Sequence, residues 1–208
     1  MSDYLKDPEA IYSLSFSTID AEADFSLLPS NAHAVARRII HACGMTDIAK
    51  NLVIDSNFVP NAQLALLAGG KVLVDAEMVR HGIITTLLPE RERIICTLND
   101  PRTREVAQEI GNTRSAAAVE LWRPHLAGSI AVIGNAPTAL FHLLDMIDAG
   151  APRPAAIVGL PVGFVGAAES KDQLIANPRG IPFIALRGRQ GGSAMAAAVI
   201  NALLGDAA

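Results

Sequence analysis

The chain has 208 residues and fits one domain of ordinary size, covering residues 1–208. Half of its residues are hydrophobic but only 4% are aromatic, so its core must consist of Ala, Val, Ile and Leu. The net charge of −4 argues against nucleic acid as a partner, because a phosphate backbone requires a basic face. Short apolar stretches interrupted by Gly and Pro exclude a membrane span, and the first ten residues do not look like a signal peptide.

The cysteine and arginine usage adds two expectations. The chain contains only Cys43 and Cys96, which suits a protein of the reducing cytoplasm. Its 17 basic residues are mostly Arg, and the guanidinium group binds carboxylates in a bidentate fork. An anionic small molecule is therefore an expected ligand, although genomic base composition would produce the same bias.

The predicted elements begin with an N-terminal arm. Residues 1–29 lack clear periodicity, which predicts an extended arm with a short helical turn near Asp7-Pro8. After it, helices capped by polar residues or Pro alternate with short apolar strands. The predicted helices are residues 31–43, 60–68, 76–81, 100–110, 113–122, 136–147, 167–176 and 193–204. The predicted strands are residues 52–54, 71–75, 93–98, 129–133, 155–158 and 182–186.

This alternation predicts an α/β fold, a three-layer sandwich with a mostly parallel central sheet flanked by helices, plus the extended N-terminal arm. Ligands of such folds bind beyond the carboxyl ends of the strands. The residues at those ends are Asp75, Gly134-Asn135 (the latter expected to cap the next helix), 159–166 and 187–193.

His41 lies in the last turn of the first predicted long helix, before the glycine stop at Gly44. The carbonyl end of a helix favours a protonated histidine, which could supply a proton near neutral pH. A capping or core-edge histidine is the alternative and is more common at such positions.

Three loops have the character of anion sites. Residues 159–166 contain three glycines but match neither the dinucleotide fingerprint nor a phosphate loop. Residues 187–193, with Arg187 and Arg189, and the segment Thr113-Arg114-Ser115 each precede a predicted helix N-terminus. The alternative for residues 159–166 is a tight strand-to-helix connection, and the alternative for the other two segments is a helix cap with a solvated arginine. Three such places in one chain favour a ligand with several carboxylates.

Other chemistries find little support. The five histidines have no zinc-site spacing, and no nucleophile elbow is present, so we expect no metal site. His41 and Cys43 are two residues apart on a helix and point to different faces, which makes a thiolate–imidazole pair improbable.

Longer blocks make the sequence recognisable. Two of them read Asp75-Ala76-Glu77-Met78-Val79 and His41-Ala42-Cys43-Gly44. The full set is residues 10–12, 15–16, 21–24, 41–44, 75–79, 111–118, 133–141, 161–171, 188–189 and 191–194. In this order and over nearly the whole chain, the sequence resembles the precorrin-8X methylmutase family of cobalamin biosynthesis.

The resemblance implies an isomerase that moves a methyl group between neighbouring carbons of ring C of precorrin-8X, giving hydrogenobyrinate, with no cofactor or metal. It implies that His41 is the proton donor or acceptor, that Ser15 binds substrate, and that Arg114 with Ser115 anchors it; Arg189, in the last shared block, joins the expected substrate-binding residues. It also implies a homodimer with active sites near the subunit interface. The expected ligands are the tetrapyrrole substrate and product, and adjacent pathway enzymes are further candidate partners.

One segment departs from the family pattern. Family members usually carry a Thr-Arg pair and another Arg before the Leu-Pro that corresponds to Leu88-Pro89, whereas residues 83–88 here contain no Arg. If those arginines hold substrate carboxylates, this chain lacks the contacts.

Three alternatives to precorrin-8X methylmutase activity stay open. The first is the same rearrangement on cobalt-precorrin-8. The second is a corrinoid carrier that binds hydrogenobyrinate without turnover. The third, a nucleotide-binding oxidoreductase, is disfavoured by the missing fingerprint.

Overall fold

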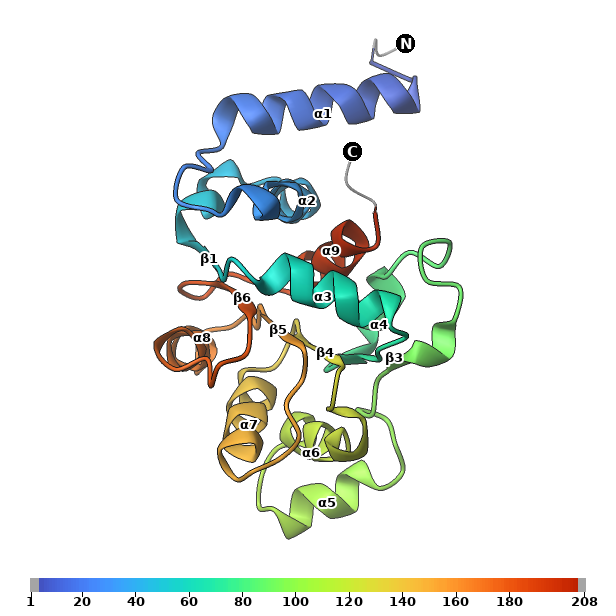
Figure 1. The fold of residues 1–208 in the computed structure, drawn as a ribbon, viewed down its shortest axis with the longest axis vertical. Coiled ribbons are helices and arrows are strands. Elements are labelled where there is room, and N and C mark those ends of the chain that lie inside the picture. The colour runs from blue at the N-terminus through green and yellow to red at the C-terminus, as the bar shows by residue number, and fades with distance from the viewer. Residues whose placement is uncertain (1–3, 206–208) are drawn as a thin grey trace.

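The computed structural model describes residues 4–205, which form a central six-stranded sheet covered by helices (Figure 1). The strand order is β1-β6-β5-β4-β2-β3. Every neighbouring pair is parallel except β1 with β6, where Leu52 lies opposite Leu186 in an antiparallel edge pair. The strands are β1 Leu52–Ile54, β2 Val72–Val74, β3 Ile94–Ile95, β4 Ile130–Ile133, β5 Ala156–Gly159 and β6 Phe183–Leu186. The prediction of a mostly parallel sheet is therefore confirmed.

Helices cover both faces of the sheet, which completes the predicted three layers. Helices α2, α3, α4 and α9 contribute to one buried hydrophobic cluster, and α6, α7 and α8 contribute to the other. The helices are α1 Pro8–Glu22, α2 His33–Cys43, α3 Phe58–Leu67, α4 Glu77–Gly82, α5 Thr103–Glu109, α6 Arg114–Glu120, α7 Pro137–Asp148, α8 Ala167–Ala176 and α9 Ser193–Leu203. Within residues 4–205, no helix combines the length and apolar character needed to cross a membrane.

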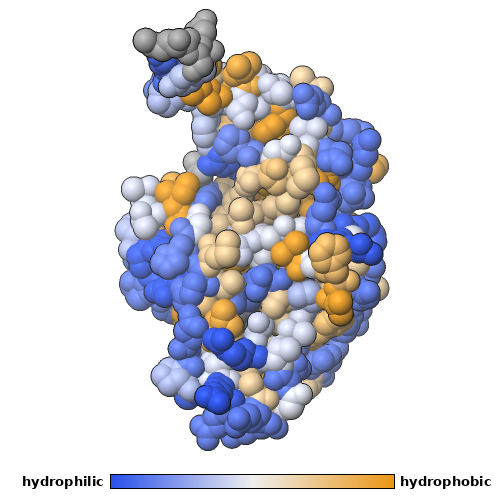
Figure 2. All heavy atoms as spheres, turned by 180° about the vertical axis from the view of Figure 1, so that it is seen from behind, coloured by the Kyte–Doolittle hydropathy of each residue, from blue (hydrophilic) through white to orange (hydrophobic). Residues whose placement is uncertain are grey.

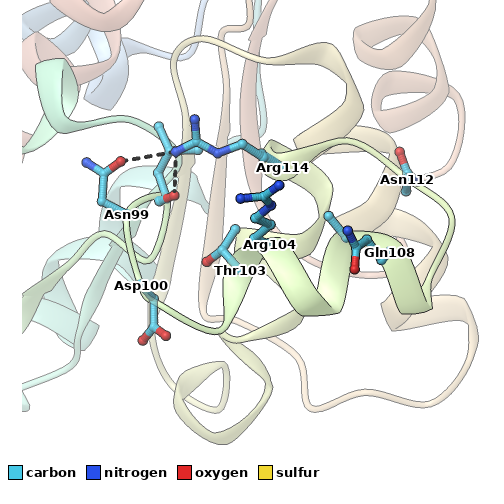
Figure 3. Close-up of a pocket in the computed structure, with 9 residues that line it drawn as sticks. Asn99, Asp100, Thr103, Arg104, Gln108, Asn112 and Arg114 are labelled. Atoms are coloured by element: carbon cyan, nitrogen blue, oxygen red, sulfur yellow. Dashed lines mark hydrogen bonds between the residues drawn. The ribbon is translucent and has the colours of Figure 1, made fainter.

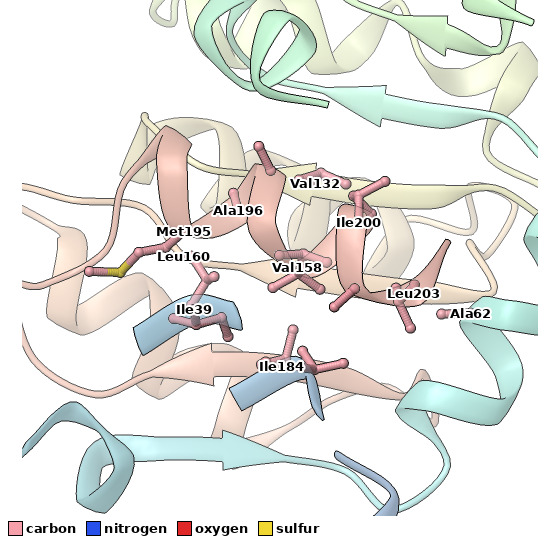
Figure 4. Close-up of a cluster of buried hydrophobic side chains, with 14 of the residues drawn as sticks. Ile39, Ala62, Val132, Val158, Leu160, Ile184, Met195, Ala196, Ile200 and Leu203 are labelled. Carbon is pink, nitrogen blue, oxygen red and sulfur yellow. The ribbon is translucent and has the colours of Figure 1, made fainter. Parts of the chain in front are cut away.

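Helix α9 is the centre of the first cluster. Its side chains Ala196 and Ile200 are fully buried with Ile39 of α2 and with Val158 and Ile184 of the sheet (Figure 4). Small side chains allow the backbones to approach closely: a Cβ on Gly134 would lie 2.7 Å from Ala196 Cβ. This close packing fixes α2, and with it His41, against the start of α9.

The N-terminal prediction is wrong in its conformation. Residues 8–22 form a helix, not an extended arm, and Figure 1 shows it lying across α2 at one end of the molecule. Asp7 caps the helix by accepting a hydrogen bond from the N–H of Glu9 at 3.2 Å, and Pro8 occupies its first turn. Only Phe16 and Ile19 of this helix are buried, so the helix carries no continuous apolar stripe. Without such a stripe, the hydrophobic periodicity of the sequence did not reveal it.

The cap of α7 is also different from the prediction. Asn135 does not cap this helix; the carboxylate of Asp75, at the end of β2, accepts the N–H groups of Gly134, Asn135 and Ala136 at 2.8, 3.0 and 2.8 Å. Asp75 is 1% exposed, and burial raises the pKa of its carboxyl group while these three donors oppose the rise. The carboxylate of Asp75 thus fixes the turn that precedes α7, and no side chain of the described residues caps the helix itself.

Candidate active site

His41 lies where the sequence predicts, in the last turn of α2. The helix ends at Gly44, whose φ of 69° is left-handed and whose N–H donates to the carbonyl of Ile40 at 2.7 Å. The imidazole is exposed, so it is not a core histidine. His41 lines a hollow together with Gly82 and with residues from the first turns of α9. Because α9 follows β6, this position is near the carboxyl ends of the strands.

Helix α1 supplies the immediate neighbours of His41. The hydroxyl of Ser15 and Nδ1 of His41 form a hydrogen bond of 2.9 Å. The ring of Phe16 stacks on the imidazole, with centroids 5.1 Å apart and planes 17° apart, and the ring of Tyr12 lies 5.4 Å away. Since Nδ1 is engaged by Ser15, Nε2 is the ring nitrogen left for another partner.

Arg38 lies one helical turn before His41 on α2. Its guanidinium carbon lies 5.2 Å from the centre of the Tyr12 ring and 5.7 Å from that of Phe16, and it donates a hydrogen bond to the Tyr12 hydroxyl. Arg38 is only 8% exposed, so its charge is held against aromatic faces beneath the histidine. Ser15 and His41 were predicted; Tyr12, Phe16 and Arg38 were not.

The charge state of His41 is the reverse of the prediction from its helix. Partial burial lowers the pKa of His41 below its ordinary value of 6.5, and the positive charge of Arg38 lowers it further. Desolvation and a full neighbouring charge outweigh the partial charge of a helix end, which falls off within a turn. Both causes favour the neutral ring, and a neutral imidazole can accept a proton.

Two hollows border His41. One, of about 310 Å³, lies between Tyr12, Arg38, Gly82 and the α9 residues Ala194, Ala197, Ala198 and Asn201. The other, of about 250 Å³, lies between α1, the end of α2 and Thr46. Figure 2 shows the surface hollowed and weakly hydrophobic below the projecting end of α1. Each hollow is at or below the lower end of the range of roughly 300–1,000 Å³ for small-molecule sites.

The segment without arginines is attached to one wall of the larger hollow through Asn201, which lines it. Asn201 of α9 donates from Nδ2 to the carbonyl of Gly82 at 3.0 Å and accepts the N–H of Ile84 at 2.9 Å. Arg91 donates to the carbonyls of Ile83 and Arg80 at 3.1 and 3.0 Å. These bonds hold the backbone at the start of residues 83–88, but no residue of this segment lines the hollow itself.

Arg114 lies elsewhere, at the start of α6, where the side chain of Thr113 accepts the N–H of Ala116 at 3.2 Å as a helix cap. Its Nη2 donates to the carbonyl of Leu98 at 3.1 Å and to Asn99 Oδ1 at 3.2 Å, and it lines a third hollow of about 650 Å³ (Figure 3). Ser115 is half-buried and makes no side-chain hydrogen bond within residues 4–205. The structure does not bring either residue into contact with His41 in one chain.

Arg189 belongs to a pair of joined loops. Its guanidinium carbon lies 5.5 Å from the centre of the exposed Phe164 ring, and its carbonyl accepts the N–H of Gly163 at 3.2 Å. The buried Lys171 donates from Nζ to the carbonyl of Pro161 at 3.1 Å and to that of Gln190 at 2.6 Å, which joins the loops that follow β5 and β6. Burial lowers the pKa of Lys171 to about 8.

The donor chemistry for a metal is sparse. Across residues 4–205, no three His, Cys, Asp or Glu side chains lie together in a group that could hold a metal ion. The arrangement around His41 instead contains a neutral imidazole, a hydroxyl and a guanidinium, which are groups for proton exchange and anion binding.

The fold and these groups define an α/β protein with an exposed histidine, hydrogen-bonded to a serine, beside the helices that cover its sheet. The family model for precorrin-8X methylmutase matches residues 10–205. The chain is 55% identical to the precorrin-8X methylmutase of Pseudomonas aeruginosa over 98% of each chain, and 38% identical to the cobalt-precorrin-8 methylmutase of Methanothermobacter thermautotrophicus over 87% of this chain and 84% of that one. The solved precorrin-8X methylmutase of Thermus thermophilus is 35% identical and superposes with a TM-score of 0.83 over 94% of each chain.

The chain therefore belongs to the precorrin-8X methylmutase family, a family of isomerases. The resemblance found in the sequence blocks is confirmed, and so is the α/β architecture that it implied.

Proposed function

We propose that this protein moves a methyl group between neighbouring carbons of ring C of precorrin-8X, giving hydrogenobyrinate, with His41 exchanging the proton that assists the shift. One carbon–carbon bond breaks and another forms within the same molecule, so the atoms balance without a co-reactant. The observation that carries the proposal is the hydrogen bond of 2.9 Å between Ser15 and Nδ1 of the exposed His41, which leaves Nε2 for a substrate. Family membership supplies the reaction class.

In this proposal the resting imidazole is neutral and takes a proton from the macrocycle before returning one. The lowered pKa of His41 favours that state, and the Ser15 hydroxyl can donate to or accept from Nδ1 as the tautomer changes. Holding the ring system in one tautomer away from water supplies much of the acceleration expected for a reaction within one molecule. Arg114, Ser115 and Arg189 bind the carboxylates at the edge of the macrocycle.

The working form in this proposal is a homodimer. The hollows beside His41 and beside Arg114 share no residue, and neither hollow at His41 is large enough to enclose a four-ring macrocycle. Helix α1 exposes Ile11 and Leu14 at 46% and 60%, and a hollow of about 690 Å³ lies along it beside Tyr12 and Phe16. A second copy covering α1 would close the site over the substrate. We place this dimer in the cytoplasm, where adjacent enzymes of the pathway would deliver the substrate and receive the product.

Metal-free precorrin-8X is the favoured substrate, because the chain is 55% identical to a relative named for it and 38% identical to one named for cobalt-precorrin-8. The test incubates purified protein with each substrate in parallel and follows the absorption change of corrin formation. We expect faster turnover of precorrin-8X. Preference for the cobalt substrate would overturn the assignment, and tight retention of hydrogenobyrinate without turnover would indicate a carrier instead.

A further inference from the structure

The hollow between α5 and α6 contains a second arginine with no assigned role. Arg104 of α5 and Arg114 of α6 both line this space of about 650 Å³. Figure 3 shows the guanidinium group of Arg104 rising from α5 toward the side chain of Arg114. The two cations therefore share one concave surface, which lies beside the loop that follows β3.

The hollow has no free carboxylate to balance these charges. Asp100, the one acidic residue that lines it, accepts hydrogen bonds from Nε and Nη2 of Arg102 at 2.9 and 2.7 Å. Those bonds hold the pKa of the Asp100 carboxyl at about 2, so its charge is present and already paired. Arg102 thus pairs with the one carboxylate that lines the hollow of Arg104 and Arg114.

The two arginines are bound differently. Arg114 is fixed by the neutral acceptors Leu98 O and Asn99 Oδ1, which orient its guanidinium without neutralising it. Arg104 is exposed and makes no ion pair or hydrogen bond with any side chain or carbonyl among residues 4–205. Two like charges facing the same space favour an anion between them, and a carboxylate accepts from two guanidiniums readily.

We propose that Arg104 and Arg114 together form a carboxylate clamp that binds an acidic side chain at the edge of the tetrapyrrole, with Arg104 closing on the ligand after Arg114 has oriented it. The clamp presupposes the proposed function, because the tetrapyrrole is the polycarboxylate that the reaction supplies. Arg104 lines a hollow that shares no residue with the two at His41, so we expect it to act in substrate binding and not in proton exchange.

The test measures the Kd of hydrogenobyrinate by absorbance titration, and kcat and KM with precorrin-8X, for the wild type and for Arg104→Gln, Arg104→Lys and Arg153→Gln. Arg153→Gln is the matched control, since Arg153 is an exposed arginine outside every hollow described above. We expect Arg104→Gln to raise Kd and KM roughly tenfold to hundredfold with kcat unchanged, as loss of a charge-assisted hydrogen bond does. Arg104→Lys should recover part of the affinity, because it keeps the charge but not the fork.

A second arm uses a hydrogenobyrinate derivative in which the carboxylates are converted to amides. Arg104→Gln and the wild type should bind this derivative with the same Kd. The clamp is wrong if Arg104→Gln binds the carboxylate form within twofold of Arg153→Gln while the wild type converts precorrin-8X normally. If the wild type neither converts precorrin-8X nor binds the product, the proposed function itself has failed and the clamp fails with it. Thermal unfolding of each variant shows whether the exposed substitution has left the fold intact.

Discussion

At the scale of single residues, partial burial and the charge of Arg38 together lower the pKa of His41. The guanidinium of Arg38 lies over the rings of Tyr12 and Phe16, one helical turn before the imidazole, and its charge disfavours a second cation there. The helix end alone would favour the opposite state. The packing of α1 on α2 decides between the neutral and the protonated imidazole, because it places the rings of Tyr12 and Phe16 against Arg38 and His41.

Replacing Arg38 with Met should raise the pKa of His41 toward its ordinary value of 6.5, because one of the two causes of its depression is removed. The midpoint of the His41 ring signals in an NMR titration measures this directly. In kcat/KM against pH, the loss of activity on acidification should begin at a higher pH than in the wild type. Arg38→Lys keeps the charge and should keep the wild-type midpoint; an unchanged midpoint in Arg38→Met would contradict the assigned cause.

Replacing Ser15 with Ala should reduce kcat/KM by roughly tenfold to hundredfold, because the imidazole loses the hydrogen bond that orients it. Ser56→Ala is the matched control, since Ser56 is an exposed serine outside every hollow described above and its side chain makes no hydrogen bond within the described part of the chain. Equal activity of the two variants would show that Ser15 does not position His41.

At the scale of elements, Lys171 connects the loops after β5 and β6. Its Nζ donates to one carbonyl oxygen on each loop, Pro161 O and Gln190 O. The loops are also pressed together: a Cβ on Gly191 would lie 2.4 Å from the carbonyl oxygens of Leu160 and Pro161. This contact explains why glycine occupies that position and why the arginine loop has a defined place.

The free energy of unfolding should carry the signature of this buried amine. Its pKa falls from 10.5 to about 8 on folding, so between those pH values the unfolded chain binds more protons and stability rises with pH. From pH 8 to pH 10.5, the free energy of unfolding of the wild type should rise relative to that of Lys171→Met by on the order of 1–3 kcal/mol. Below pH 8 the difference between the two proteins should not change with pH. Urea unfolding at several pH values measures the difference, with the exposed Lys50→Met as control. If the difference in unfolding free energy between the wild type and Lys171→Met stays constant with pH, the lowered pKa of Lys171 is refuted.

The elements themselves could largely be predicted from the sequence, because alternating apolar strands and capped helices are local patterns. Helix α8 begins and ends at the predicted residues, and the prediction for β1 is equally close. Helix α1 could not be predicted by periodicity, since it buries only Phe16 and Ile19. The contact of α1 with His41 could not be predicted either. Tyr12 and Phe16 lie near Ser15 at helical spacing, but nothing in the sequence indicates that this face of the helix meets His41.

At the scale of the whole molecule, the proposed homodimer accounts for the distribution of the proposed site residues. His41 and Arg114 line separate hollows, and α1 exposes apolar side chains beside the first of them. We expect sedimentation equilibrium to give twice the chain mass of 21.8 kDa. Leu14→Glu should dissociate the dimer and reduce turnover, because it places a charge on the exposed face of α1.

Leu67→Glu is the matched control for this test, since Leu67 on α3 is 86% exposed and lies on another element. It should leave both the mass and the turnover unchanged. A fully active monomer would contradict the proposed assembly.

The central claim, that one imidazole exchanges the proton for methyl migration, is tested most directly by single-turnover conversion of precorrin-8X with His41→Ala. The exposed position of His41 means that the variant should fold and should still bind hydrogenobyrinate. We predict that the absorption change of corrin formation disappears in this variant while product binding stays within a fewfold of the wild type. Conversion at the wild-type rate would contradict the account.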